Sequence, residues 1–180
     1  MKKNFLISTG GSGGHVMPAI ILYDHLLKES NVIISTDNRG LKYLDGVINQ
    51  LEIIDTPKLH NIFFLPFNLI KIVFLTFKSF FLMKHKKIDK VFSFGGYMSL
   101  PIILAARVLK LQIYLIEPNQ VLGRANKFFL KFCKKIFCYT EKIKNFPNTS
   151  KDKIRIINPL VKENIYKLNS INKSKNKFTL

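Results

Sequence analysis

The stretch NFLISTGGSGGHVMPAI, residues 4–20, indicates the fold class of this chain. It opens with a short apolar run over residues 4–9, which is typical of a buried strand. Glycines follow at once, and Pro18 suits the first turn of a helix, where its missing N–H is not needed. We therefore predict a strand, a glycine-rich loop and a helix in direct succession, with the helix over residues 18–29.

The same alternation continues along the chain. It predicts strands at residues 4–9, 32–36, 51–55, 89–94, 112–116, 136–140 and 153–157, and helices at 18–29, 66–86, 100–110 and 122–134. Strands that alternate with helices favour an α/β fold, here a Rossmann-like open parallel sheet with helices on both faces. Residues 1–166 are expected to form this domain. The polar run NSINKSKNK is typical of a linker, and the strand-like FTL follows it, so residues 167–180 are expected to lead into a further domain.

Basic residues are concentrated in the second part of the sequence. Residues 1–60 hold six basic and six acidic residues, whereas residues 61–180 hold 23 basic and five acidic ones, so the whole net charge of +18 lies there. This asymmetry suggests an anionic partner, such as a lipid surface or a phosphate group. Only four of the cations are arginines, and lysine is a poor reader of base edges, so specific nucleic-acid binding is not expected.

Residues 63–83, FFLPFNLIKIVFLTFKSFFLM, are long and apolar enough to span a membrane. Lys71 and Lys78 argue against a span, because each costs about 2.5–3.5 kcal/mol near the bilayer centre. An apolar helix with a polar stripe and a cationic end is typical of a helix that lies on a membrane surface. Part of the helix must also cover the sheet. We predict membrane contact through the following residues: Phe74, Phe77, Phe80, Phe81, Lys71 and Lys78.

Three loops follow predicted strands: GGSGGH at residues 10–15, FGGYMS at 94–99 and EPNQ at 117–120. The carboxyl ends of parallel strands share one edge of a sheet, where ligands bind, so the loops are expected to face one cleft. Glycines let the backbone approach a ligand closely, and the helix N-terminus favours an anion. The first loop has no Gly-Lys-Ser/Thr sequence of a P-loop and fits a dinucleotide fingerprint poorly. Asp37 keeps a dinucleotide-binding domain open as a competing interpretation.

The segments GGSGGHVMPA, FGGYMSLP and EPNQVLGRANK, in this order, resemble the N-terminal domain of the MurG family of GT-B glycosyltransferases, over residues 4–159. The resemblance implies an inverting transfer of GlcNAc from UDP-GlcNAc to a polyprenyl-diphospho-muramoylpentapeptide in peptidoglycan synthesis, without a metal or other cofactor. It also implies a peripheral enzyme on the cytoplasmic face of the bacterial inner membrane. The N-terminal domain would bind the acceptor and an anionic membrane surface, and a C-terminal domain would bind the donor.

The resemblance also assigns roles to single residues, again as expectations. His15 and Glu117 are the candidate catalytic bases, and the alternatives are a histidine that orders its loop and a carboxylate that binds loop N–H groups. Donor-sugar contacts are expected from Ser12, Gly13, Gly14 and Asn119. Acceptor contacts are expected from Gly11, Gly95, Gly96, Tyr97 and Ser99. Lys162 stands near an arginine that follows an Asn-Pro pair in the family.

Three other functions stay open at this stage. The chain would also resemble the acceptor subunit of a two-chain lipid-linked-sugar GlcNAc transferase. A module that binds a dinucleotide or an anionic lipid without catalysis is a second alternative, and non-specific binding of nucleic acid through the basic part is a third.

Overall fold

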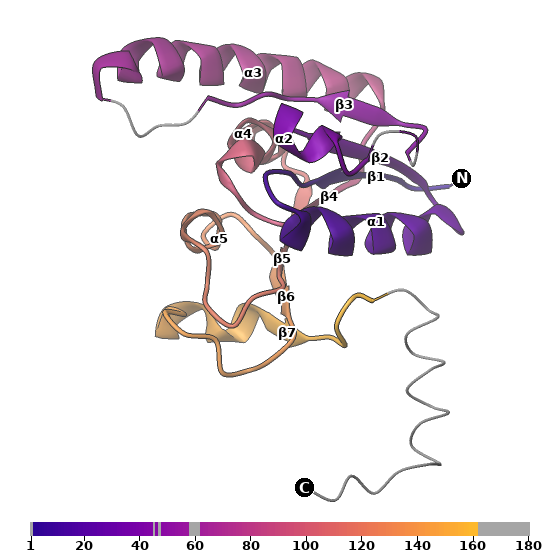
Figure 1. The fold of residues 1–180 in the computed structure, drawn as a ribbon, viewed down its shortest axis with the longest axis vertical. Coiled ribbons are helices and arrows are strands. Elements are labelled where there is room, and N and C mark those ends of the chain that lie inside the picture. The colour runs from indigo at the N-terminus through magenta and orange to yellow at the C-terminus, as the bar shows by residue number, and fades with distance from the viewer. Residues whose placement is uncertain (1, 45, 47, 58–61, 162–180) are drawn as a thin grey trace, which may run out of the picture.

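The structure is a computed structural model, and it describes residues 2–44, 46, 48–57 and 62–161 (Figure 1). The predicted linker, the start of a further domain and Lys162 lie outside the described residues.

Seven parallel strands form one sheet in the order β3-β2-β1-β4-β5-β6-β7. They are β1 (Asn4–Ser8), β2 (Asn31–Thr36), β3 (Leu51–Ile53), β4 (Lys90–Ser93), β5 (Gln112–Glu117), β6 (Lys135–Cys138) and β7 (Ile154–Ile156). Each corresponds to a predicted strand, with ends that differ by one or two residues. The central strands are buried on both faces, as Leu6 and Ile7 show by their complete burial, and such strands are continuous apolar runs in the sequence.

The α-helices are α1 (Gly13–Leu27), α2 (Asn38–Leu41), α3 (Leu65–His85), α4 (Leu100–Val108) and α5 (Arg124–Phe129). Apolar residues of α1 pack on one face of the sheet with Phe5 and Ile7. Those of α3, α4 and α5 pack on the other face with Leu6 and Val91. In Figure 1, β1 and β2 accordingly pass between α1 and α3. The doubly wound architecture is thus confirmed.

Helix α1 begins five residues before the predicted start. The N–H groups of His15 and Val16 both donate to the carbonyl oxygen of Ser12, at 3.1 and 3.2 Å, so the helix starts inside the glycine loop. The prediction that Pro18 opens the helix is therefore wrong, because Pro18 is its sixth residue. A proline is favoured in the first turn but not confined to it.

Helix α5 is shorter than predicted, and α2 was missed. The N–H of Leu122 donates to the carbonyl oxygen of Lys144, and the N–H of Lys144 donates to that of Gln120. These contacts hold residues 120–122 in a bridge with residue 144, which prevents an earlier start of α5. Helix α2 is a single turn capped by Asp37, too short to leave a periodic pattern.

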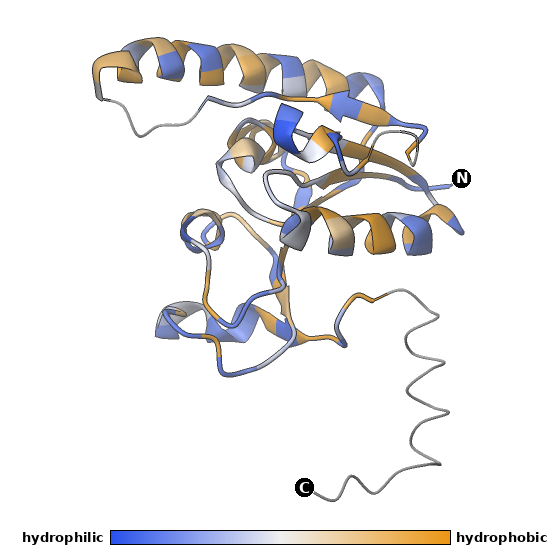
Figure 2. Cartoon of the chain, in the orientation of Figure 1, coloured by the Kyte–Doolittle hydropathy of each residue, from blue (hydrophilic) through white to orange (hydrophobic). Residues whose placement is uncertain are grey.

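Helix α3 packs on the domain along one narrow stripe. Its buried residues are Ile72, Leu75, Ser79 and Met83, which share a helix face. The helix is long and apolar enough to cross a membrane by length and composition, and Figure 2 shows its mixture of apolar and polar residues. Most of its apolar surface faces away from the core.

Candidate functional site

The three predicted loops meet at the carboxyl edge of the sheet. They follow β1, β4 and β5, which are direct neighbours. The N–H of Phe94 donates to the carbonyl oxygen of Ser8 at 3.0 Å, and the hydroxyl of Ser8 donates to that of Ser99 at 3.0 Å. The first and second loops are therefore joined at their bases.

The first loop places helical N–H groups at this edge. Ser12 is the N-cap of α1, and Gly13 and Gly14 form its first turn, where N–H groups lack an intrahelical acceptor. The carboxylate of Asp37, which directly follows β2, holds the start of the loop, since its Oδ1 accepts the N–H of Gly11 at 2.8 Å. The loop can thus present its N–H groups to a phosphate or a sugar.

His15 lies half-buried in the first turn of α1. A hydrogen bond to its backbone holds the residue in place without using the imidazole. The hydroxyl of Thr9 donates to the carbonyl oxygen of His15 at 2.9 Å. Burial lowers the pKa of His15 below its ordinary value of 6.5, while the negative charge of Glu117 opposes this shift. The imidazole is therefore neutral at neutral pH and can accept a proton.

The second loop turns sharply through two glycines in the left-handed region. Gly95 and Gly96 have φ angles of 82° and 80°, and a Cβ on Gly95 would lie 2.7 Å from Oδ1 of Asn126. The Ser99 hydroxyl donates to the carbonyl oxygen of Gly95 at 2.8 Å. Ser99 is fully buried, so it stabilises the loop from inside the protein. Tyr97 is half-buried at the carboxyl edge of the sheet.

The third loop is organised by Glu117, which is 1% exposed. One carboxylate oxygen accepts the backbone and side-chain N–H groups of Asn119, at 3.2 and 2.9 Å. The other accepts the N–H of Gly123 at 2.9 Å and the side-chain N–H of Asn126 at 3.1 Å. With both oxygens engaged inside the protein, the geometry favours the role of loop organiser over that of a base. Asn119 remains exposed beside it.

Two residues of the site were missed by the sequence analysis. Asn126 is buried and connects the third loop with Gly95, and its Oδ1 has no hydrogen-bond partner among the described residues. Arg39 lies over the ring of Tyr97, with its Cζ 5.1 Å from the ring centroid. Asn126 belongs to the quoted segment EPNQVLGRANK, but neither residue carries a motif that predicts its contacts.

Asp37 does not fit the role of a ribose-binding acid. The residue is 1% exposed, and its two oxygens bind the N–H groups of Gly11 and Gly40 and the guanidinium of Arg39. It is thus fully engaged within the protein, which removes the residue on which the dinucleotide interpretation depended.

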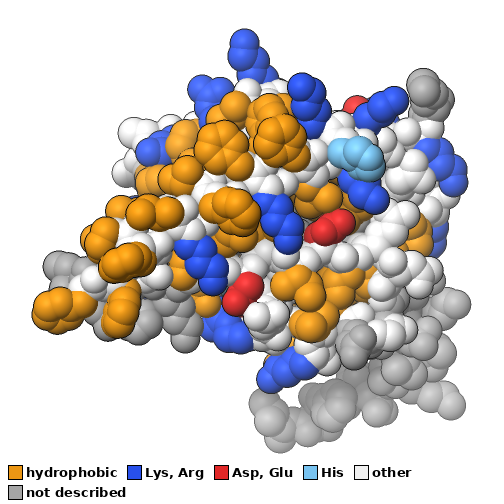
Figure 3. Space-filling view, turned by 90° about the horizontal axis from the view of Figure 1, so that it is seen from above, with side chains coloured by type: hydrophobic (Ala, Val, Ile, Leu, Met, Phe, Trp, Pro, Cys, Tyr) orange, Lys and Arg blue, Asp and Glu red, His pale blue; other side chains and the backbone are white. Residues whose placement is uncertain are grey.

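A large apolar surface lies away from the three loops, on the outer side of α3. We call it the aromatic patch, and its exposed members are Phe63, Phe64, Phe67, Ile70, Val73, Phe74, Phe77 and Phe81, joined by Val108 of α4. Figure 3 shows these apolar side chains with basic side chains among and around them. Phe80, another predicted contact, is half-buried and packs partly against the core. Lys71 is exposed, and Lys78 donates to the carbonyl oxygen of Ile53 at 3.3 Å.

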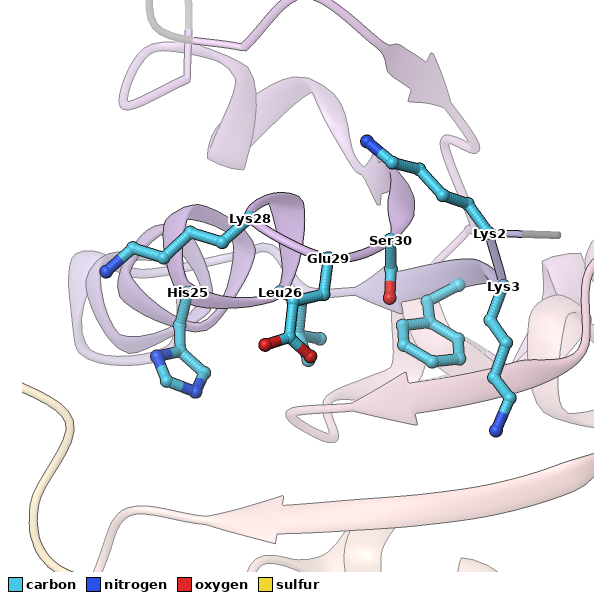
Figure 4. Close-up of a pocket in the computed structure, with 8 residues that line it drawn as sticks. Lys2, Lys3, His25, Leu26, Lys28, Glu29 and Ser30 are labelled. Carbon is cyan, nitrogen blue, oxygen red and sulfur yellow. The ribbon is translucent and has the colours of Figure 1, made fainter.

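A second hollow in the structure lies far from the three loops. An open pocket of about 640 Å³ lies at the amino end of the sheet, where Figure 4 shows Glu29 between His25 on one side and Lys2 and Lys3 on the other. This is the edge opposite the glycine loops. Among the described residues, no group of three or more His, Cys, Asp or Glu side chains is arranged to hold a metal ion.

The geometry defines a doubly wound α/β domain whose glycine-rich and polar loops gather at the carboxyl edge of its sheet. The N-terminal domain of glycosyltransferase family 28 matches residues 5–138, and the chain belongs to this family.

Relatives in sequence and structure agree with this assignment. A UDP-N-acetylglucosamine–N-acetylmuramyl-(pentapeptide) pyrophosphoryl-undecaprenol N-acetylglucosamine transferase of Pelagibacter ubique is 48% identical, over 97% of this chain and 49% of the relative. Its counterpart in Rickettsia prowazekii is 38% identical, over 94% of this chain and 44% of the relative. The chain thus spans about half the length of these relatives.

Solved structures show a similar fold. MurG of Acinetobacter baumannii superposes with a TM-score of 0.72 and 27% identity, over 86% of this chain and 45% of that one. A UDP-GlcNAc 2-epimerase of Methanocaldococcus jannaschii has a TM-score of 0.63 at 15% identity, over 86% of this chain and 45% of that one, and shares the fold.

Proposed function

We propose that this chain is the acceptor-binding half of an inverting glycosyltransferase. The enzyme moves GlcNAc from UDP-GlcNAc to a polyprenyl-diphospho-muramoylpentapeptide, at the cytoplasmic face of the bacterial inner membrane. The donor half lies in the same polypeptide or in a partner subunit. The observation that carries the proposal is the meeting of three loops at the ends of β1, β4 and β5, the first of which leads into His15, in a chain 48% identical to a transferase of this activity.

The roles of the loops follow from their chemistry. Gly11 and the second loop, Gly95 to Tyr97, let the backbone approach the acceptor diphosphate closely and present an aromatic ring to the acceptor sugar. Ser12, Gly13, Gly14 and the exposed Asn119 face the donor sugar. Neutral His15 accepts the proton of the acceptor hydroxyl as this hydroxyl attacks the anomeric carbon, and UDP leaves.

The aromatic patch gives this half a means of reaching a lipid-linked acceptor. Its side chains bury apolar area in the interfacial region of a bilayer, and each nearby lysine adds about 1 kcal/mol on an anionic leaflet. A buried stripe on the other side of α3 holds the helix on the domain, which favours a surface position over a span.

The direct test is binding to vesicles that carry the acceptor lipid, compared with vesicles of equal charge without it. We expect tighter binding to the acceptor vesicles. Equal binding to both would contradict the proposal and leave a basic, membrane-surface module, the alternative that needs no acceptor.

Replacing Phe74 and Phe77 together with serine is expected to weaken binding to both kinds of vesicle by about 10–100-fold. Each exposed phenylalanine loses on the order of 1 kcal/mol or more of apolar transfer energy. Vesicle sedimentation measures the effect. Phe128→Ser, at an exposed phenylalanine of α5, is the matched control. An equal loss in the control would contradict a specific patch.

The pH dependence of transfer is expected to reflect His15. Protonated imidazole cannot accept a proton, so kcat/KM should rise with pH through the pKa of His15 and then level off. Because burial lowers this pKa, the midpoint should lie below 6.5. The measurement needs a donor half, which a chimera with the C-terminal half of the Pelagibacter ubique relative supplies. A midpoint above pH 7 would assign the base to another group.

A further inference from the structure

A charged side chain connects the two glycine loops across the sheet. Arg39 follows β2, the first loop follows β1 and the second follows β4, and these strands are neighbours in the order β2-β1-β4. Arg39 therefore starts on one side of the first loop and reaches the second loop on its other side.

Asp37 fixes the direction of Arg39. Its Oδ2 accepts Nε and Nη2 of Arg39 at 3.0 and 2.9 Å. Its Oδ1 accepts the N–H of Gly11 at 2.8 Å and that of Gly40 at 2.9 Å. One buried carboxylate thus orients both the guanidinium and the start of the first loop.

Arg39 then contacts both loops. A Cβ on Gly11 would lie 3.3 Å from Nη2 of Arg39, so the guanidinium packs closely against the backbone of the first loop. On the other side, Cζ of Arg39 lies 5.1 Å from the ring centroid of Tyr97, within the range of a cation–π contact. The side chain of Arg39 is 46% exposed, so it lies at the surface beside the two loops and not in the core.

We propose that Arg39 is a positioning residue that holds the ring of Tyr97 against the first glycine loop, so that both loops meet the acceptor diphosphate as one preformed site. The inference rests on the proposed function. Because the ring of Tyr97 is already ordered, ligand binding loses less conformational entropy, which favours a lower Kd.

The test is a double-mutant cycle on acceptor binding by this chain. The probe is a vesicle carrying polyprenyl-diphospho-muramoylpentapeptide, with acceptor-free vesicles as the baseline. Arg39→Met is expected to raise the Kd for acceptor vesicles about fivefold, the size of a partly exposed cation–π contact. In a Tyr97→Leu background the same change should have almost no effect, whereas in Tyr97→Phe, which keeps the ring, it should have its full effect.

Three further variants separate positioning from stability. Asp37→Asn/Arg39→Met leaves no unpaired buried carboxylate, and the amide oxygen introduced at position 37 can still accept both backbone N–H groups, so this variant should bind as weakly as Arg39→Met. Arg39→Lys keeps the cation and should restore part of the binding. Arg155→Met, at an exposed arginine of β7, should bind as wild type does.

The outcomes distinguish the two proposals. A wild-type chain that does not prefer acceptor vesicles would overturn the proposed function and this inference with it. If the wild-type chain does prefer acceptor vesicles, three results would overturn this inference alone. Arg39→Met could leave the Kd unchanged, or it could raise the Kd as much in the Tyr97→Leu background as in the wild-type chain. The Asp37→Asn/Arg39→Met variant could also bind as tightly as wild type.

Discussion

Transfer by the chimeric enzyme should fall by about 10²–10⁴-fold when His15 is replaced with alanine, the usual contribution of a positioned general base. The loss should appear in kcat, because the imidazole is needed only when the acceptor hydroxyl gives up its proton. Both backbone hydrogen bonds of His15 remain in the variant, since Thr9 donates to its carbonyl oxygen and its own N–H donates to Ser12. The start of α1 should therefore be unchanged.

The comparison that makes this result specific is His25→Ala, an exposed histidine near the other end of the same helix. It should leave kcat and KM as they are in the parent chimera. If His15→Ala instead raised the KM for the acceptor with little change in kcat, His15 would be a histidine that orders the loop and not the base.

Replacing Glu117 with glutamine is expected to lower the free energy of unfolding by about 3 kcal/mol. Its carboxylate accepts four hydrogen bonds at a site that is 1% exposed. In glutamine, one oxygen becomes an NH2 group that faces N–H donors, which leaves buried donors unsatisfied at about 1–3 kcal/mol each. Denaturant unfolding of the chain measures the loss, and acceptor binding should weaken with it as the third loop loses its shape.

Glu141→Gln, at an exposed carboxylate, is the reference variant and should be as stable as wild type. If Glu117→Gln left the stability of the chain unchanged but abolished transfer by the chimera, the role of loop organiser would be contradicted. It would mean that Glu117 takes the proton itself, the second catalytic role that the sequence left open.

The sequence predicted the strands well because each carries its own local signal. Parallel strands covered on both faces are short continuous apolar runs, and seven such runs became the seven strands. Helix boundaries were predicted less well, since they depend on contacts with distant residues. The late start of α5 follows from a bridge to Lys144, and the early start of α1 follows from the carbonyl of Ser12.

The sequence by itself determined the α/β class, the three loops and their common edge, and the apolar helix α3. These follow from periodicity and from the rule that parallel strands end together. Only the tertiary structure decided what the polar residues at that edge do. It buried Glu117 among N–H donors, attached Asp37 to Gly11 and placed Arg39 over Tyr97. The order β2-β1-β4 brings these residues together, and no local pattern encodes the order in which strands pair.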